Sequence, residues 1–212
     1  MVYRESRSNA GFDLKWTDNR VHNVLFGFEY VDINVDHELY EYFESGVSYV
    51  ADWNPWFFVE PDTRRRILST TFQEEYRPVD ELTVTFGLRH DKYNDIDSEI
   101  SPRLATVWRI NQNNIFKAQY ARAFRPPTFY ESYEIGGAVT EVEGSSINTF
   151  ELGYIFKNNK AEYGVTLFNS KIDQFIVFDE ARGFINNESA RMRGVEFELT
   201  QQLNKKLNID AN

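Results

Sequence analysis

The sequence lacks several features that define common classes of protein. It has no cysteine among its 212 residues, which excludes disulfide bonds and thiol chemistry. Basic residues number 23 against 33 acidic ones, and the net charge of -10 disfavours nucleic acid as a partner, because phosphate binding needs a basic surface. Apolar runs reach only four residues, as in residues 56–59. A membrane-spanning helix needs about 20, so none is expected.

Signals of catalysis are also sparse. The three histidines, His22, His37 and His90, lie far apart in the sequence. No nucleophile elbow, phosphate-binding loop or spaced set of metal ligands occurs. We therefore expect no enzymatic activity, no catalytic residue, no metal site and no cofactor. No apolar segment of a signal peptide follows Met1, so an exported protein would begin upstream of this sequence.

Aromatic residues are abundant, with 18 Phe, 12 Tyr and 4 Trp, although the mean hydropathy is only -0.54. Many rings in a polar sequence indicate bands of aromatic residues rather than a thick soluble core. The rings fall on a period of two, which is the period of a β-strand. Residues 82–91 show it best, because Leu, Val, Phe and Leu alternate there with Thr, Thr, Gly, Arg and Asp.

The connections between the alternating runs are of two kinds. Short polar turns lie near residues 18–20, 77–81, 111–114, 157–160 and 204–206, and longer stretches lie near 32–65, 92–100, 125–146 and 179–185. The two kinds alternate along the chain, as in outer-membrane barrels with tight turns on one rim and long loops on the other. About ten strands are predicted, near residues 2–17, 21–32, 65–77, 81–92, 101–110, 114–124, 147–157, 161–178, 185–201 and 207–212.

Several predicted strands have the length of membrane strands, which need about 9–11 residues, whereas strands of soluble proteins usually have about 5–6. One face of these strands is aliphatic or aromatic and the other is polar, which suits lipid outside and a wet or plugged lumen inside. The predicted fold is therefore all-β, a segment of a transmembrane antiparallel up-and-down barrel that forms an open curved sheet. A soluble β-sandwich with one buried face would show the same alternation.

Five motifs follow one another along the chain, namely residues 72–91 (FQEEYRPVDELTVTFGLRHD), 101–109 (SPRLATVWR), 120–131 (YARAFRPPTFYE), 149–154 (TFELGY) and 186–199 (NNESARMRGVEFEL). In this order they resemble motifs of TonB-dependent outer-membrane receptors. Each motif alone is weak, but the five together are specific. His90 stands where the family usually has Tyr, and residues 1–64 match only in general style.

The resemblance implies an outer-membrane receptor of a Gram-negative bacterium for energised uptake of a scarce nutrient, such as a ferric siderophore. Residues 1–212 would form part of its β-barrel domain, with the plug domain and the C-terminal strands outside this sequence. The implied partners are outer-membrane lipid, lipopolysaccharide, a small-molecule ligand and the TonB system. A passive porin-like channel and a soluble all-β binding module are the alternatives.

Residues 32–63 are rich in acidic and aromatic residues and contain no Lys or Arg, and three arginines follow directly. We interpret this segment as an extracellular loop in which rings contact a flat ligand and arginines attract an anionic chelate or lipopolysaccharide phosphate. The candidate ligand-binding residues are Tyr40, Tyr42, Trp53, Trp56, Arg64 and Arg65. Alternatively, the loop is solvated and pairs its own charges.

Charged residues on the polar face of the strands are candidates for contact with the lumen or the plug, namely Glu75, Arg89, Arg103, Glu151 and Glu196. Alternatively, they are simply solvated, or they pair across neighbouring strands. Pro126 and Pro127 are expected to end a strand, because proline has no N–H to donate to a sheet.

Overall fold

The computed structural model describes residues 2–18, 20–44, 47–51, 63–132, 142–187 and 189–212, with only the backbone of residues 2–4, 36–44 and 47–51. Strands dominate, and one short helix is present, α1 (Phe129–Ser132). The strands are β1 (Val2–Asp18), β2 (His22–Glu44), β3 (Val47–Ala51), β4 (Arg64–Val79), β5 (Leu82–Tyr93), β6 (Glu99–Arg109), β7 (Asn114–Arg125), β8 (Ser145–Lys157), β9 (Ala161–Asp173), β10 (Ile176–Asp179), β11 (Gly183–Asn186), β12 (Ser189–Asn204) and β13 (Leu207–Ala211). No described helix has the length and apolar content to cross a membrane.

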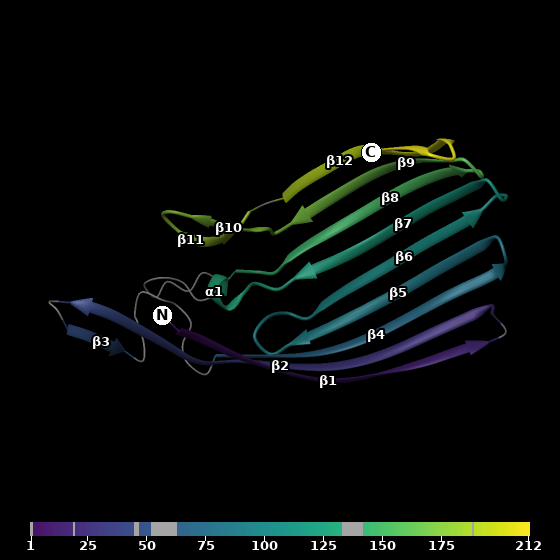
Figure 1. Cartoon of the computed structure of the whole chain (residues 1–212). Coiled ribbons are helices and arrows are strands. Elements are labelled where there is room, and N and C mark those ends of the chain that lie inside the picture. The colour runs from purple at the N-terminus through teal and green to yellow at the C-terminus, as the bar shows by residue number, and fades with distance from the viewer. Residues whose placement is uncertain (1, 19, 45–46, 52–62, 133–141, 188) are drawn as a thin grey trace.

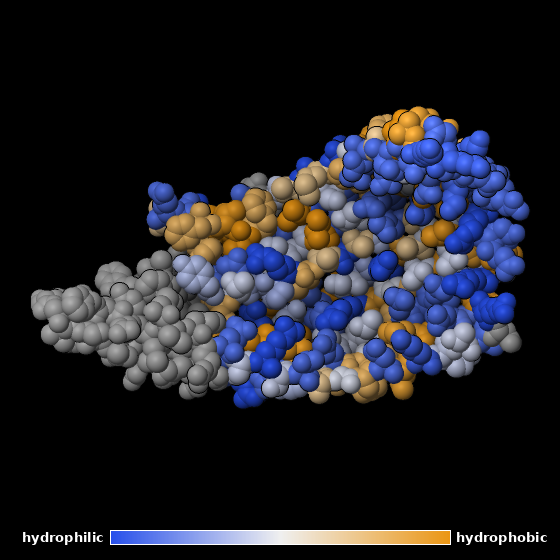
Figure 2. All heavy atoms as spheres, viewed as in Figure 1, coloured by the Kyte–Doolittle hydropathy of each residue, from blue (hydrophilic) through white to orange (hydrophobic). Residues whose placement is uncertain are grey.

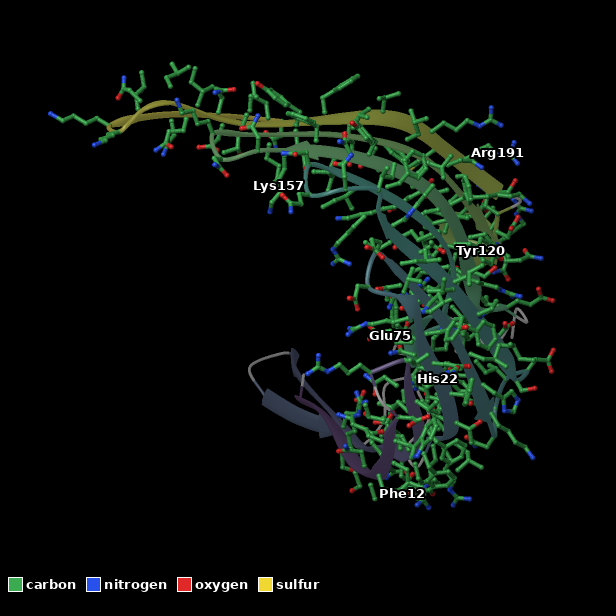
Figure 3. The ribbon with its side chains drawn as sticks, turned by 90° about the vertical axis from the view of Figure 1, so that its right-hand side faces the viewer. Phe12, His22, Glu75, Tyr120, Lys157 and Arg191 are labelled. Carbon is green, nitrogen blue, oxygen red and sulfur yellow. The ribbon has the colours of Figure 1, made fainter. Side chains whose placement is uncertain are left out.

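Ten strands form one antiparallel sheet in the order β1-β2-β4-β5-β6-β7-β8-β9-β12-β13, and β3 pairs with the far end of β2. Each strand pairs with the next one in this order, so the sheet is an up-and-down meander (Figure 1). Viewed along the strands, it curls into an open trough (Figure 3). The predicted open, curved sheet of about ten strands is confirmed.

The two rims of the sheet differ as the sequence predicts. Tight turns join β1 to β2, β4 to β5, β6 to β7, β8 to β9 and β12 to β13 at the right-hand rim of Figure 1, which we call the short-turn rim. One such turn is fixed by Asn158, whose side-chain oxygen accepts hydrogen bonds from the N–H groups of Lys160 and Ala161 at 2.8 and 2.9 Å. Longer connections, α1 and the β10–β11 hairpin lie at the opposite, long-loop rim.

The two faces of the sheet have opposite chemistry. The convex face carries large apolar side chains that stay exposed, such as Leu14 at 61% and Phe197 at 67%. Figure 2 looks into the concave face, where hydrophilic side chains cover most of the strands. Figure 3 labels Phe12 on the convex side and Glu75 on the concave side. Among the described residues, a small apolar core lies only at the long-loop rim, where Val35, Phe129 and Ile33 pack together.

Three predicted boundaries are wrong. The strand predicted at 21–32 continues to Glu44, because residues 33–39 pair with the start of β1 across one register shift and residues 40–44 pair with β3. The strand predicted at 161–178 ends at Asp173, and the one predicted at 185–201 begins at Ser189. Between them lies the separate β10–β11 hairpin, which follows a left-handed backbone at Gln174 (φ 54°). β7 ends at Arg125, directly before the two prolines, as predicted.

Candidate functional site

The concave face holds a network of charged and polar side chains around Arg89. Its guanidinium donates to the carboxylate of Asp91 and to the hydroxyl of Ser69, each at 2.9 Å, and lies 3.5 Å from the carboxylate of Glu29. Ser69 also donates to Asp91, and both are nearly buried, at 1% and 7% exposure. The strand register places Glu29, Ser69 and Asp91 side by side on β2, β4 and β5.

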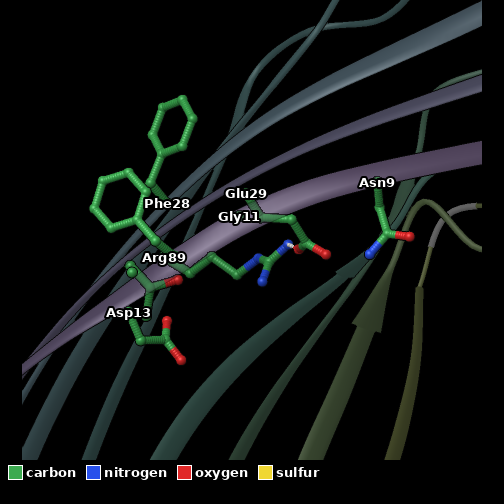
Figure 4. A pocket seen from close by; sticks show the side chains of 9 residues that line it. Asn9, Gly11, Asp13, Phe28, Glu29 and Arg89 are labelled. Carbon is green, nitrogen blue, oxygen red and sulfur yellow. Dashed lines mark ion pairs between the residues drawn. The ribbon is translucent and has the colours of Figure 1, made fainter.

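This network borders an open polar cavity of about 500 Å³ near the β1 edge (Figure 4). It is lined by Asn9, Gly11, Phe12, Asp13, Gly27, Phe28, Glu29, Thr71 and Arg89. Two of the lining residues, Gly11 and Gly27, have no side chain to fill the cavity. A Cβ on Gly11 would lie only 2.6 Å from the carbonyl oxygen of Phe28. Figure 4 marks the ion pair between Glu29 and Arg89 and labels Asp13 beside the Arg89 side chain. Such a cavity suits a polar or cationic group from another segment.

The other predicted lumen residues are spread over the concave face. Glu75 and Glu151 occupy one row across the sheet, through Thr85, Ala105 and Gln119. Glu151 accepts a hydrogen bond from Gln119, and Glu75 pairs with Arg77 at 2.7 Å. Arg103 lies opposite Gly87, and Glu196 lies opposite Thr166. Only Arg89, of the five predicted residues, belongs to the network, and contact with a plug stays a prediction for all five.

At the long-loop rim, Arg65 is buried against two separate parts of the chain. Its Nε donates to Asp95 at 2.7 Å, and its Nη1 donates to the carbonyl oxygen of Pro127 at 2.6 Å. The guanidinium carbon lies 5.0 Å from the ring centre of Phe129, within the range of a cation–π contact. The Arg65 side chain therefore joins β4 to the β5–β6 connection and to the segment before α1.

The predicted ligand-binding residues are described only in part. Trp53 and Trp56 lie outside the described residues, and so do the side chains of Tyr40 and Tyr42 on β2. Arg64 is about half exposed and forms a bidentate pair with Asp32, with the Nε bond at 2.6 Å. Arg65 is only 5% exposed and its Nε and Nη1 bond Asp95 and Pro127, which favours a role in holding the connections. Ligand contact stays a prediction for each of these residues.

Three rings at the long-loop rim were missed from the sequence. Tyr130 of α1 and Phe178 of β10 both lie edge-on to Phe184 of β11, at 5.3 and 5.2 Å between ring centres. Tyr130 and Phe178 remain half exposed. We call these three residues the rim aromatic cluster. Tyr130 lies far in the sequence from the hairpin partners Phe178 and Phe184, so no local pattern could have grouped all three.

A capping box shapes the segment that carries Tyr130. The backbone N–H of Thr128 donates to the Glu131 carboxylate at 2.7 Å, and the N–H of Glu131 donates back to the Thr128 hydroxyl at 3.2 Å. Arg125 adds a bond to the same carboxylate at 2.8 Å. Partial burial raises the pKa of Glu131, but the hydrogen bonds from Arg125 and Thr128 outweigh it and hold that pKa below its ordinary value.

Neither rim nor concave face offers a metal site within the described ranges, because no group of three His, Asp or Glu side chains converges there. The arrangement instead combines an apolar convex face, a polar concave face and an aromatic and charged long-loop rim. Such a surface is suited to lipid on one side and to polar or ring-bearing ligands on the other.

Several solved structures share this fold. The siderophore receptor PirA of Pseudomonas aeruginosa has a TM-score of 0.77 at 20% identity, over 96% of this chain and 38% of that one. A G324V mutant of the ferric enterobactin receptor PfeA of P. aeruginosa has a TM-score of 0.75 at 17% identity, over 96% and 34%. The FrpB iron transporter of Neisseria meningitidis has a TM-score of 0.70 at 13% identity, over 95% and 34%.

The chain thus spans between a third and two fifths of the length of these structures. No curated protein matches it. The family described as "TonB dependent receptor-like, beta-barrel" matches residues 2–212, which is nearly the whole chain. It is a family of receptors and not of enzymes. The chain belongs to the TonB-dependent receptor β-barrel family.

Proposed function

We propose that this chain forms part of the membrane wall of an outer-membrane receptor that takes up a scarce nutrient, such as a ferric siderophore, with energy from the TonB system. The observation that carries the proposal is the inverted placement of its apolar residues. Rings and aliphatic side chains that would form a core in a soluble domain lie exposed along the convex face, whereas buried groups such as Ser69 and Asp91 are polar.

Hydrocarbon around the convex face accounts for this placement. Water would leave a contiguous apolar surface across ten strands without a partner, and soluble monomers rarely expose such surfaces. A soluble sandwich would need a second sheet against the same face. Among the described residues, the elements outside the main sheet are β3, α1 and the small β10–β11 hairpin. Lipid therefore fits the convex face better than protein does.

The open edges of β1 and β13 support a place within a larger barrel. Unpaired backbone groups cost several kcal/mol each in hydrocarbon, so membrane sheets close on themselves. We therefore assign the remaining strands and the plug domain to parts of the receptor outside residues 1–212. The concave network around Arg89 would then face the lumen or the plug, and the short-turn rim would face the periplasm. The bacterium would be Gram-negative, and the long-loop rim would lie among lipopolysaccharide.

A ligand with aromatic rings fits the long-loop rim. The neighbouring structures are named as siderophore and ferric enterobactin receptors, and enterobactin is bound in two mutants of PfeA. In this chain the exposed rings of the rim aromatic cluster supply a surface on which a flat ligand could stack. The predicted residues Tyr40, Tyr42, Trp53, Trp56 and Arg64 would extend that surface.

Uptake of radiolabelled iron chelates tests the proposal. Cells that carry the full-length gene should accumulate at least one chelate that a deletion strain does not, and an uncoupler of the proton-motive force should abolish the difference. Uptake that persists under the uncoupler would favour the passive channel. Equal uptake by both strains across a broad panel of chelates would contradict the proposed receptor function.

The rim aromatic cluster has its own test. Replacing Phe178 with Ser removes a half-exposed ring, and we expect chelate affinity to fall about tenfold, as for a typical interface anchor. The matched control is Arg182→Ala in the β10–β11 turn, where the pair with Asp179 at 3.2 Å is lost and the rings stay. Binding titrations of both purified variants measure the effect, and equal loss in the two would contradict a stacking role.

A further inference from the structure

The convex face carries one histidine–carboxylate pair within its apolar surface. His22 Nδ1 lies 2.7 Å from the carboxylate of Glu74, across the β2–β4 pairing. Both residues occupy convex positions, because they alternate in phase with Val24 and Phe26 on β2 and with Phe72 on β4. Each side chain is about one-third exposed. The pair is not needed for strand pairing, which the backbone provides.

The pair lies at the height of the aromatic band. The ring of His22 stacks on Tyr76, with 4.9 Å between ring centres, and more loosely on Trp16 at 6.5 Å. All three rings adjoin the tight turns of the short-turn rim, and Trp108 and Tyr163 lie near the same rim on the convex face. Tyr and Trp mark the level of lipid headgroups on membrane proteins. The His22–Glu74 pair therefore faces headgroups rather than the hydrocarbon centre.

The free atoms of the pair define what it can bind. His22 uses Nδ1 toward Glu74, and the structure gives Nε2 of His22 and the second carboxylate oxygen of Glu74 no bond within the described chain. An ammonium group can donate to that carboxylate oxygen, and a protonated imidazole can donate from Nε2 to a phosphate oxygen. The two sites are adjacent, as are the ammonium and phosphate of one headgroup.

We propose that His22 and Glu74 form a binding site for the headgroup of an aminophospholipid. The primary ammonium of the lipid donates to Glu74, and its phosphate meets the imidazole edge of His22. Choline headgroups have the same phosphate but no N–H to donate. Glycerol headgroups carry the phosphate charge without an ammonium, so that negative charge would lie beside the Glu74 carboxylate. The site therefore favours phosphatidylethanolamine over the choline and glycerol phospholipids. This inference rests on the proposed placement of the chain in an outer membrane.

Lipid titration of the full-length receptor tests the site. The receptor is purified in detergent and titrated with phosphatidylethanolamine, phosphatidylcholine or phosphatidylglycerol, and bound lipids are counted by native mass spectrometry. We expect the tightest phosphatidylethanolamine site to exceed phosphatidylcholine about tenfold in affinity, as for one charge-assisted hydrogen bond. Glu74→Gln should abolish that preference. His22→Gln should weaken the binding of all three lipids, because each carries a phosphate, while leaving part of the preference for phosphatidylethanolamine.

The matched control is Glu162→Gln, which removes a carboxylate near the same rim on the concave face, where it faces Lys157 at 3.9 Å. It should leave the lipid preference unchanged. A difference in electrophoretic migration between heated and unheated samples checks that each variant keeps its folded barrel. A wild-type receptor with equal affinity for the ethanolamine and choline lipids would overturn the site. A preference that survives Glu74→Gln would overturn it as well. The lipid affinities are measured without chelate uptake, so a failure of this lipid site can be distinguished from a failure of the proposed function.

Discussion

The guanidinium of Arg65 lies over the ring of Phe129, 5.0 Å from its centre, although the two residues are 64 positions apart. Its bond to Pro127 holds the same segment, and its bond to Asp95 adds the β5–β6 connection to the contact. The fully buried Pro127 and the buried Phe129 pack beside it. One arginine at the start of β4 thus positions the β5–β6 connection and the segment that leads into α1, which carries Tyr130 of the rim aromatic cluster.

Removing this arginine should be costly. We expect Arg65→Ala to lower the free energy of unfolding by about 2–4 kcal/mol, because Asp95 and the Pro127 carbonyl lose a buried donor. Arg66→Ala is the matched control, since Arg66 is exposed and its change should stay within about 0.5 kcal/mol. Urea unfolding of the full-length receptor in detergent micelles measures both. Equal effects of the two substitutions would contradict the positioning role.

Two glycines on the concave face should respond differently to alanine. A Cβ on Gly11 would lie 2.6 Å from the backbone oxygen of Phe28, whereas a Cβ on Gly87 would meet nothing closer than 3.7 Å. We expect Gly11→Ala to destabilise the β1–β2 pairing by about 1–3 kcal/mol, because a backbone oxygen cannot move aside. Gly87→Ala should stay within about 0.5 kcal/mol. The same urea titration compares them, and a neutral Gly11→Ala would show that β1 shifts freely.

Much of the wall could be predicted from sequence because lipid and lumen impose a strict period of two on each strand. Residues 82–91 show the alternation most clearly, and β5 lies there as Leu82–Tyr93. The turns could also be predicted, because Asn158 and the Pro126–Pro127 pair act on their immediate neighbours in the sequence. The family motifs indicated the type of barrel. Alternation alone could not distinguish a membrane barrel from a soluble sandwich.

The parts that sequence reasoning missed depend on contacts between distant residues. The contacts of Arg65 were missed because its neighbours Asp95 and Phe129 are far along the chain. The pair of His22 and Glu74 was missed because a register between β2 and β4 creates it. The β10–β11 hairpin depends on the left-handed turn at Gln174, and Gln is not a residue that signals such a turn.

Acidification should loosen the capping box before α1. The folded-state pKa of Glu131 lies below its ordinary value, so this carboxylate stabilises the segment above the ordinary Glu value of about 4.3. That contribution is lost as pH falls through the lower folded-state pKa, because protonation removes the acceptor for Arg125 and Thr128. Hydrogen exchange of the amides of residues 128–132, corrected for intrinsic rates, should show protection fading in this acidic range. Glu131→Gln should show weaker protection at neutral pH and little change on acidification.

Residues 1–212 expressed alone should not insert into membranes as a functional transporter. The outer edges of β1 and β13 present unpaired N–H and C=O groups, and lipid offers them no hydrogen-bond partner. The exposed apolar convex face adds a driving force for association in water. We therefore expect aggregates, or material that stays soluble only in detergent, and no conductance in planar bilayers. The full-length receptor, reconstituted in the same way, is the control for insertion. A stable, conducting pore from residues 1–212 would show that the two edges can pair with each other and that the wall closes without further strands.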